Sequence, residues 1–248
     1  INKTTMRVLL TMLLSITTLA AAAQNAEDIL SKVDENMASD NRIVEASMTI
    51  HGKRNSRTIT SRTYSVGTKQ SFTEYLTPGR EQGTKMLKLD NQLWIYSPST
   101  DRTIQLSGHM LRQSVMGSDL SYEDLMDDRK LTEVYTATLA GTEDVDGRKT
   151  FVLELTAKVS DVAYHSRKIW VDTERFVPLK EELFAKSGQL LKRTTLSDVK
   201  LIEGRWFPTF IVFKDVLKQG DGTEYKMTSI KFNQKIPEYI FTKAALKQ

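Results

Sequence analysis

Short runs of alternating apolar and polar residues fill most of this chain, and they limit its possible folds more than any other feature. In one such run Leu153, Leu155 and Ala157 alternate with acidic, hydroxyl or basic side chains. Turn sequences such as Pro78-Gly79 separate the runs about every ten residues. Because successive side chains of a strand point to opposite faces, this pattern predicts one antiparallel sheet of about eleven strands.

A sheet with so many strands has to close, split into two layers or be covered, because the alternation makes one of its faces apolar over its whole width. Two segments interrupt the strand pattern and are candidates for this cover. Residues 26–37 place apolar side chains at helical spacing. The second segment, Gly108–Asp128, loses the two-residue period, and we call it the lid segment. The predicted fold is therefore α+β but mainly β: a curled antiparallel sheet that forms an incomplete (half) barrel, covered by an N-terminal helix and a helical lid segment.

The lid segment is rich in methionine, with Met110, Met116 and Met126 among its apolar positions. Ser121 followed by Asp124 matches a capping box, in which the two side chains satisfy backbone N–H groups at the start of a helix. Methionine is flexible and packs against varied apolar shapes. Two interpretations of the segment stay open: it completes the core of the sheet, or it covers a cavity that holds a ligand.

The N-terminus has the pattern of a secretory signal peptide. Lys3 and Arg7 precede an apolar run over residues 8–23, which ends in small residues at Ala21 and Ala23. An uncleaved membrane anchor is the alternative, but a membrane span needs about 20 apolar residues and this run is shorter. We expect residues 1–23 to be cleaved after Ala23, which makes the protein periplasmic in a two-membrane bacterium. Residues 24–248 contain no repeat or linker and are predicted to form a single domain.

The composition excludes several classes of site. The chain has no cysteine, so it can hold neither disulfides nor thiolate metal ligands. Its net charge of +4 is mild and its basic residues are interspersed with acids, which argues against nucleic-acid binding. The three histidines, His51, His109 and His165, are isolated from one another. The motifs GxSxG and HExxH and a Gly-rich phosphate loop are absent, so we expect no catalysis, no metal site and no cofactor.

Several stretches resemble the LolA/LolB-like family of outer-membrane lipoprotein-sorting proteins, and most closely its broader lipoprotein-sorting-like branch. They are AEDIL (26–30), GSDLSYEDL (117–125), RKIWVDTERFVPLKEELFAKSGQLLKRTTL (167–196) and GRWFPT (204–209). The resemblance implies an incomplete antiparallel barrel with an apolar interior and helices as a lid. The key arginine of the known carrier is compatible with four positions in this chain: Arg42, Arg54, Arg57 and Arg62.

The function that the resemblance implies is that of a periplasmic carrier or acceptor, without catalysis, that binds the acyl chains of a lipoprotein or lipid. Such a protein transports lipid, or acts as a chaperone for it, in outer-membrane biogenesis. Its partners would be those acyl chains and an inner-membrane exporter or an outer-membrane acceptor, and we expect a monomer. The candidate lipid-binding residues are the apolar positions of the lid segment and two aromatic residues of a strand: Trp94, Tyr96, Met110, Leu111, Val115, Met116, Leu120, Leu125 and Met126.

Two other functions remain open at this point. The first is an interaction or sensor module, accessory to an envelope export system, whose apolar groove binds a segment of a partner. The second is an enzyme that acts on a lipid-linked substrate, for which Asp119, Glu123 or His109 would supply the reactive group.

Overall fold

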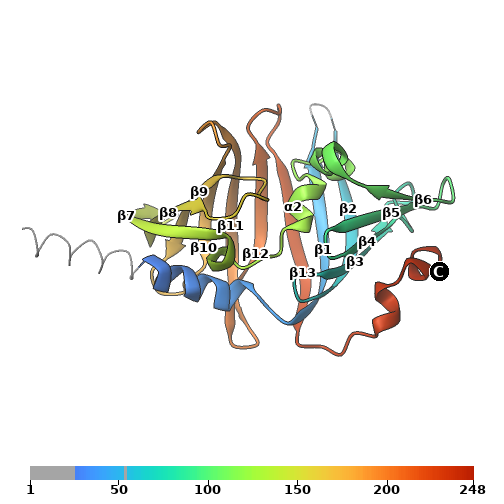
Figure 1. The fold of residues 1–248 in the computed structure, drawn as a ribbon, viewed down its shortest axis with the longest axis horizontal. Coiled ribbons are helices and arrows are strands. Elements are labelled where there is room, and N and C mark those ends of the chain that lie inside the picture. Colours follow the sequence, from blue (N-terminus) through green and yellow to red (C-terminus); the bar gives the residue numbers. More distant parts are fainter. Residues whose placement is uncertain (1–25, 53–54) are drawn as a thin grey trace, which may run out of the picture.

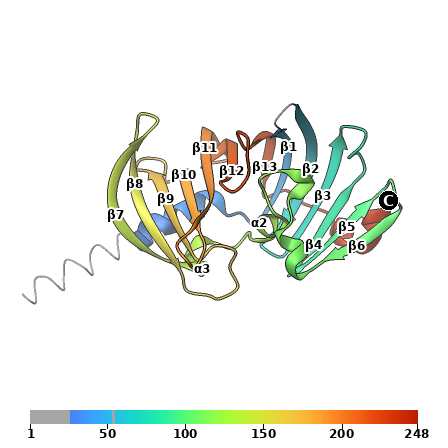
Figure 2. The same ribbon diagram turned by 90° about the horizontal axis from the view of Figure 1, so that it is seen from above.

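The computed structural model describes residues 26–52 and 55–248, so the predicted signal peptide lies outside the described residues. The main element is a single antiparallel sheet of thirteen strands (Figure 1). The sheet curls without closing, since β6 and β7 stand at opposite ends of its strand order, and from above the strands follow an open arc (Figure 2). The predicted mainly β half barrel is confirmed. It has more strands than the predicted number of about eleven, because each alternating run forms a strand of its own.

The strands form two series along the chain. The first series is β1 (Asn41–His51), β2 (Ser56–Val66), β3 (Gln70–Thr77), β4 (Lys85–Leu89), β5 (Gln92–Ser97) and β6 (Arg102–Leu106). The second series is β7 (Tyr135–Val145), β8 (Arg148–Ala157), β9 (Ser166–Asp172), β10 (Pro178–Phe184), β11 (Leu190–Ile202), β12 (Arg205–Asp215) and β13 (Thr223–Phe232). Consecutive strands pair within each series, and β1 pairs with β13 to join the two series.

This strand order places the lid segment across the open side of the sheet. β6 and β7 are consecutive in the chain, yet they form the two opposite edges of the sheet. The connection between them therefore has to pass from one edge to the other over one face of the arc. The lid segment is the central part of this connection and lies on the inner side of the arc (Figure 2). A one-turn helix, α3 (Leu131–Val134), ends the connection just before β7.

The concave face carries two separate apolar clusters. The N-terminal helix (residues 26–37) packs on β7–β9, where Leu30, Val33 and Leu153 are fully buried. The lid segment packs on the second cluster, on the β1–β6 half. The buried Asp34 carboxylate also accepts hydrogen bonds from the backbone N–H groups of Leu131 (2.8 Å) and Thr132 (2.9 Å). The N-terminal helix is thus attached to α3 as well as to the sheet.

The convex face carries a third apolar cluster, on strands β3–β5, in which Phe72, Leu87 and Trp94 are buried. Two 3-10 helices near the C-terminus, η3 (Glu238–Phe241) and η4 (Lys243–Lys247), contribute buried residues to this cluster. The C-terminal segment lies beside β4 and β5 in Figure 1. Both faces of the β3–β5 region are therefore covered, each by a different segment.

Candidate functional site

The lid segment is a series of short turns rather than one continuous helix. It contains the 3-10 helices η1 (Gly108–Arg112) and η2 (Val115–Gly117) and the one-turn helix α2 (Tyr122–Met126). A left-handed backbone at Met116 (φ 51°) and Gly117 (φ 76°) ends η2 and prevents a longer helix. The predicted capping box is confirmed. The Ser121 side chain accepts a hydrogen bond from the Asp124 N–H (3.2 Å), and the Asp124 carboxylate accepts one from the Ser121 N–H (2.6 Å).

The apolar side of the lid segment completes the cluster on the β1–β6 half of the concave face. Val115 is 2% exposed and Leu120 is 8% exposed. The strand residues of this cluster are Met48, Ile50, Ile59, Tyr75, Met86, Leu93, Ile95 and Leu106. Four further candidate residues pack around the cluster and stay partly buried: Met110, Leu111, Met116 and Met126. The middle of the segment therefore belongs to the core, while its methionine-rich flanks are less enclosed.

The other three candidate residues lie elsewhere. Leu125 is on α2 and is 36% exposed. Trp94 and Tyr96 belong to the cluster on the convex face. Because side chains alternate along β5, Leu93 and Ile95 face the lid segment instead. The structure does not bring the two aromatic residues together with the lid segment.

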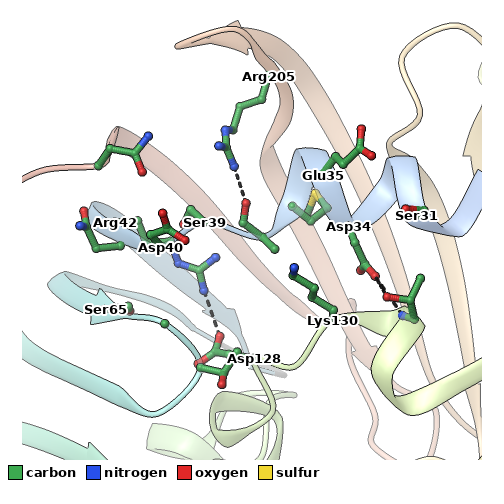
Figure 3. Close-up of a pocket in the computed structure, with 17 residues that line it drawn as sticks. Ser31, Asp34, Glu35, Ser39, Asp40, Arg42, Ser65, Asp128, Lys130 and Arg205 are labelled. Carbon is green, nitrogen blue, oxygen red and sulfur yellow. Dashed lines mark hydrogen bonds and ion pairs between the residues drawn. The ribbon is translucent and has the colours of Figure 1, made fainter.

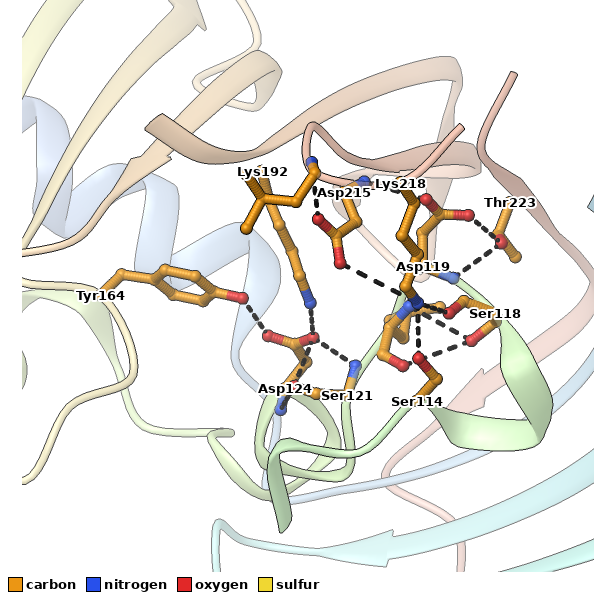
Figure 4. Close-up of polar contacts among 12 residues, drawn as sticks. Ser114, Ser118, Asp119, Ser121, Asp124, Tyr164, Lys192, Asp215, Lys218 and Thr223 are labelled. Atoms are coloured by element: carbon orange, nitrogen blue, oxygen red, sulfur yellow. Dashed lines mark hydrogen bonds and ion pairs between the residues drawn. The ribbon is translucent and has the colours of Figure 1, made fainter. Parts of the chain in front are cut away.

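Three aspartates connect the lid segment to the sheet, and the first of them, Asp119, is buried. Its carboxylate accepts hydrogen bonds from the Thr223 hydroxyl on β13 (2.8 Å) and from the Asp215 N–H on β12 (3.0 Å) (Figure 4). The Lys218 ammonium donates to the carbonyl of the adjacent Ser118. These contacts attach the middle of the lid segment to the β12–β13 hairpin.

The second aspartate, Asp124, connects α2 to the second series of strands. Its carboxylate pairs with Lys192 Nζ on β11 and accepts a 2.5 Å hydrogen bond from the Tyr164 hydroxyl (Figure 4). Burial raises the pKa of this carboxyl, but the charge and hydrogen bond of Lys192, together with the hydrogen bonds from Tyr164 and the Ser121 backbone, outweigh burial and hold the pKa below its usual range. Burial and the Asp124 charge raise the pKa of Tyr164, so its hydroxyl stays protonated and donates. The carboxylate is therefore charged at neutral pH and surrounded by donors.

The third aspartate, Asp128, borders a polar cavity of about 630 Å³ (Figure 3). It pairs with Arg42 (3.0 Å) and Lys88 (3.2 Å). The cavity lies between the end of the N-terminal helix, the start of β1 and residues 128–132. Its charged lining includes Asp34, Asp40, Arg42, Asp128, Lys130 and Arg205. This mixture of both charge signs suits water and polar groups rather than an acyl chain.

Two of the four early arginines contact the lid segment. Arg42 pairs with its last residue, and Arg57 donates to the Met116 carbonyl. Arg62 pairs with a glutamate of β1, and Arg54 is not among the residues that the structure describes. Arg42 and Arg57 are therefore the two described early arginines that contact the lid segment.

The centre of the concave face is charged, so the prediction of a face that is apolar over its whole width is wrong. Arg167 on β9, Glu181 on β10 and Lys192 on β11 share this face. They separate the cluster under the N-terminal helix from the cluster under the lid segment. A sequence signal was present: Arg167 stands in phase with the buried positions Ile169 and Val171.

In the part of the chain that the structure describes, no group of three or more His, Asp or Glu side chains is placed to hold a metal ion. Nor does that part contain a helix that is long and apolar enough to cross a membrane. Of the residues considered for catalysis, Glu123 lies on α2 and His109 is exposed on η1. The third, Asp119, is engaged in the contact with the β12–β13 hairpin.

Comparisons with known proteins agree with this fold. A family model described as "Uncharacterized protein" matches residues 67–248. An outer membrane lipoprotein-sorting protein domain from Vibrio parahaemolyticus is 24% identical with a TM-score of 0.79, over 91% of this chain and 100% of that chain. A DUF1329 family protein from Desulfovibrio piger is 25% identical with a TM-score of 0.82, over 91% of this chain and 99% of that chain. A LolA superfamily protein from Nitrosomonas europaea is 29% identical with a TM-score of 0.74, over 89% of this chain and 98% of that chain. Comparison with curated proteins gives no match.

Proposed function

We propose that this chain is a periplasmic carrier or acceptor of acyl chains. It belongs to the family whose model matches residues 67–248, and it has the fold of the LolA-superfamily lipoprotein-sorting proteins. The acyl chains of a lipoprotein or lipid bind on the concave face of the β1–β6 half, where the apolar side of the lid segment lies in the closed form. One observation carries this proposal: a connection made of short turns covers an apolar half of the sheet, and several polar contacts hold this connection in place.

The energetics of transport require such a removable cover. An acyl chain in water costs about 0.8 kcal/mol per CH₂ group, so a carrier must offer an apolar surface and must also close it when it is empty. Segments with little regular structure open at low free energy, and methionine side chains repack against varied shapes. The proposed lining consists of the strand residues of the β1–β6 cluster and the flanking residues Met110, Met116 and Met126. Trp94 and Tyr96 are not part of it, since they lie on the convex face.

A reversible cross-link tests whether the lid segment has to move. The chain has no cysteine, so Asp119→Cys combined with Thr223→Cys introduces one pair, at side chains that are 2.8 Å apart in the closed structure. We expect the oxidised variant to bind a fluorescent fatty acid at least about tenfold more weakly, because its binding-competent form is depleted. Reduction of the disulfide is expected to restore the affinity in the same sample.

The matched control is Thr49→Cys combined with Thr58→Cys, whose side-chain oxygens are 2.9 Å apart on β1 and β2. Its disulfide does not involve the lid segment, and we expect equal binding in both redox states. An oxidised lid variant that binds as tightly as its reduced form would contradict the proposal. So would a wild-type protein that neither carries acyl species in native mass spectrometry nor binds the fatty acid. Capture of one membrane partner by the lipid-free protein would favour an interaction module instead.

A further inference from the structure

Two basic side chains stand in one row across the concave face, between the two apolar clusters. Strand register places Arg167 of β9 opposite Leu183 of β10, and Leu183 opposite Lys192 of β11. Residues that are opposite one another on neighbouring strands share a face of the sheet. Because neighbouring strands are about 4.8 Å apart, the two basic side chains start ~10 Å apart and face the same interior.

Arg167 is held in place by two tyrosines. Its Nε donates to the Tyr135 hydroxyl (2.9 Å), and its guanidinium lies 4.9 Å from the Tyr135 ring centre and 5.7 Å from the Tyr164 ring centre. Tyr135 in turn donates to the Tyr164 carbonyl (2.9 Å). A guanidinium has five N–H donors, and among the described residues Arg167 makes its hydrogen bond through Nε. The terminal amino groups of a charged and oriented fork are left for another partner.

Glu181 of β10 faces the same interior, and it is a weak counter-ion for Arg167. Burial raises the pKa of the Glu181 carboxyl, and the positive charge of Arg167 offsets only part of this effect. A carboxyl with a raised pKa gives up its charge more easily than an ordinary one. The central row therefore has an excess of positive charge whenever Lys192 lacks a partner.

A carboxylate of the lid segment binds one of the two basic side chains of this row. Lys192 is 8% exposed and pairs with the Asp124 carboxylate, to which the Tyr164 hydroxyl also donates at 2.5 Å. Lys192 Nζ lies 5.9 Å and the Arg167 guanidinium 5.7 Å from the centre of the Tyr164 ring. Asp124 is thus an internal anion held by an ammonium and a phenol, and the Arg167 guanidinium lies near the ring of that same phenol. When the lid segment lifts, this anion leaves with it.

We propose that an anionic group of the ligand, a phosphate or a carboxylate, takes the place of Asp124 at Lys192 and Tyr164 and also binds the free fork of Arg167. The inference rests on the proposed acyl-binding function and names the class of ligand: an amphiphile whose chain lies on the β1–β6 cluster and whose anionic headgroup reaches the central row. The arginine fork matches the oxygens of either group with two parallel hydrogen bonds. An unpaired buried cation is unfavourable, so an anionic ligand stabilises the open form and a neutral ligand does not.

Calorimetric titration with two lipids that share one acyl chain tests this. Lauroyl lysophosphatidic acid carries the phosphate, and lauroylglycerol lacks it. We expect the wild-type protein to bind the anionic lipid at least about tenfold more tightly, because hydrogen bonds to charged groups are the strong ones. Arg167→Met is expected to abolish this preference and to leave the affinity for lauroylglycerol unchanged. The matched control is Arg193→Met, which removes an exposed arginine from the convex side of β11 and should keep the preference.

The possible outcomes distinguish a failure of the anion site from a failure of acyl binding. Equal affinity of the wild-type protein for both lipids would overturn the anion site and leave acyl binding intact, whereas binding of neither lipid would overturn the proposed function. A loss of both affinities in Arg167→Met, with an unchanged melting temperature, would also overturn the anion site. Inorganic phosphate is the third titrant, and we expect no competition at the concentrations that suffice for the lysolipid. Competition there would overturn the lipid headgroup as the occupant and assign the site to a free anion.

Discussion

Replacing Asp124 with alanine is expected to release the lid segment. Lys192 lies at a site that is 8% exposed and loses its counter-ion, and breaking a buried ion pair costs about 3–5 kcal/mol. Under the proposed function the segment lifts locally, so much of this cost is expected to appear as local opening rather than as global unfolding. We expect the backbone amides of residues 108–128 to exchange with solvent roughly 100-fold faster in hydrogen-exchange mass spectrometry, which corresponds to about 3 kcal/mol.

Two further variants test whether the faster exchange is caused by loss of the Asp124–Lys192 ion pair. Glu123→Ala removes the neighbouring carboxylate of the same helix, and its exchange is expected to match that of the wild type. Adding Lys192→Met to Asp124→Ala removes the unpaired cation as well and should recover part of the protection, since an apolar replacement of a buried pair is often neutral. The cap of α2 and the Tyr164 contact stay lost in both variants. Unchanged exchange in Asp124→Ala would show that the pair does not hold the segment closed.

The same contact predicts a pH dependence of the closed lid segment. The pKa of Asp124 is lower in the folded protein than in the unfolded chain. The pair therefore contributes its full stability above the unfolded value of about 3.9, and loses it as the pH falls through the folded-state pKa. Protection factors of the wild-type segment, corrected for intrinsic exchange, should decline below about pH 4. The double variant Asp124→Ala with Lys192→Met should lack this transition.

A carboxylate at position 115 is expected to destabilise the whole domain. Val115 is 2% exposed among the apolar side chains of the β1–β6 cluster. In Val115→Asp either a charge is buried without a partner or the segment lifts and exposes the cluster, and both are unfavourable. We expect the free energy of unfolding in urea to fall by about 3–5 kcal/mol, with a lower yield of soluble protein.

Leu125→Asp is the matched control, because it places the same charge in the same segment at a residue that is 36% exposed. Its free energy of unfolding should stay within about 0.5 kcal/mol of the wild-type value. Val115→Ala should fall between the two, at about 1–2 kcal/mol, because it removes volume without adding charge. A Val115→Asp variant that unfolds at the wild-type urea concentration would show that the segment only covers the face and is no part of the core.

Local patterns in the sequence were enough to predict most of the elements. The alternation around Leu153 and Leu155 predicted β8, and Pro78-Gly79 predicted the turn between β3 and β4, because both signals depend on residues that are close in the chain. Ser121 and Asp124 predicted the cap of α2 for the same reason. The half barrel follows from the number and alternation of these strands.

Local patterns could not predict contacts between residues that are far apart in the sequence. Asp124 and Lys192 are 68 positions apart, and they meet only because the lid segment crosses over β11. The alternation along β5 separated Trp94 and Tyr96 from the aliphatic residues, as the structure shows. Which of the two sets faces the interior depends on the direction in which the sheet curls and on the C-terminal segment that covers its outside. Neither is encoded near β5.

The attachment of the lid segment at both ends has a mechanical consequence. Its chain continues into β6 on one side and, through α3, into β7 on the other, and these strands are the two edges of the sheet. A segment anchored in this way has no free tip and cannot rotate about a single hinge. It can only bow outward while its ends stay in place, and its contour length also limits how far the two edges can separate. Under the proposed function, the aperture through which an acyl chain would enter therefore lies beside the bowed segment, and its width is set by one stretch of chain.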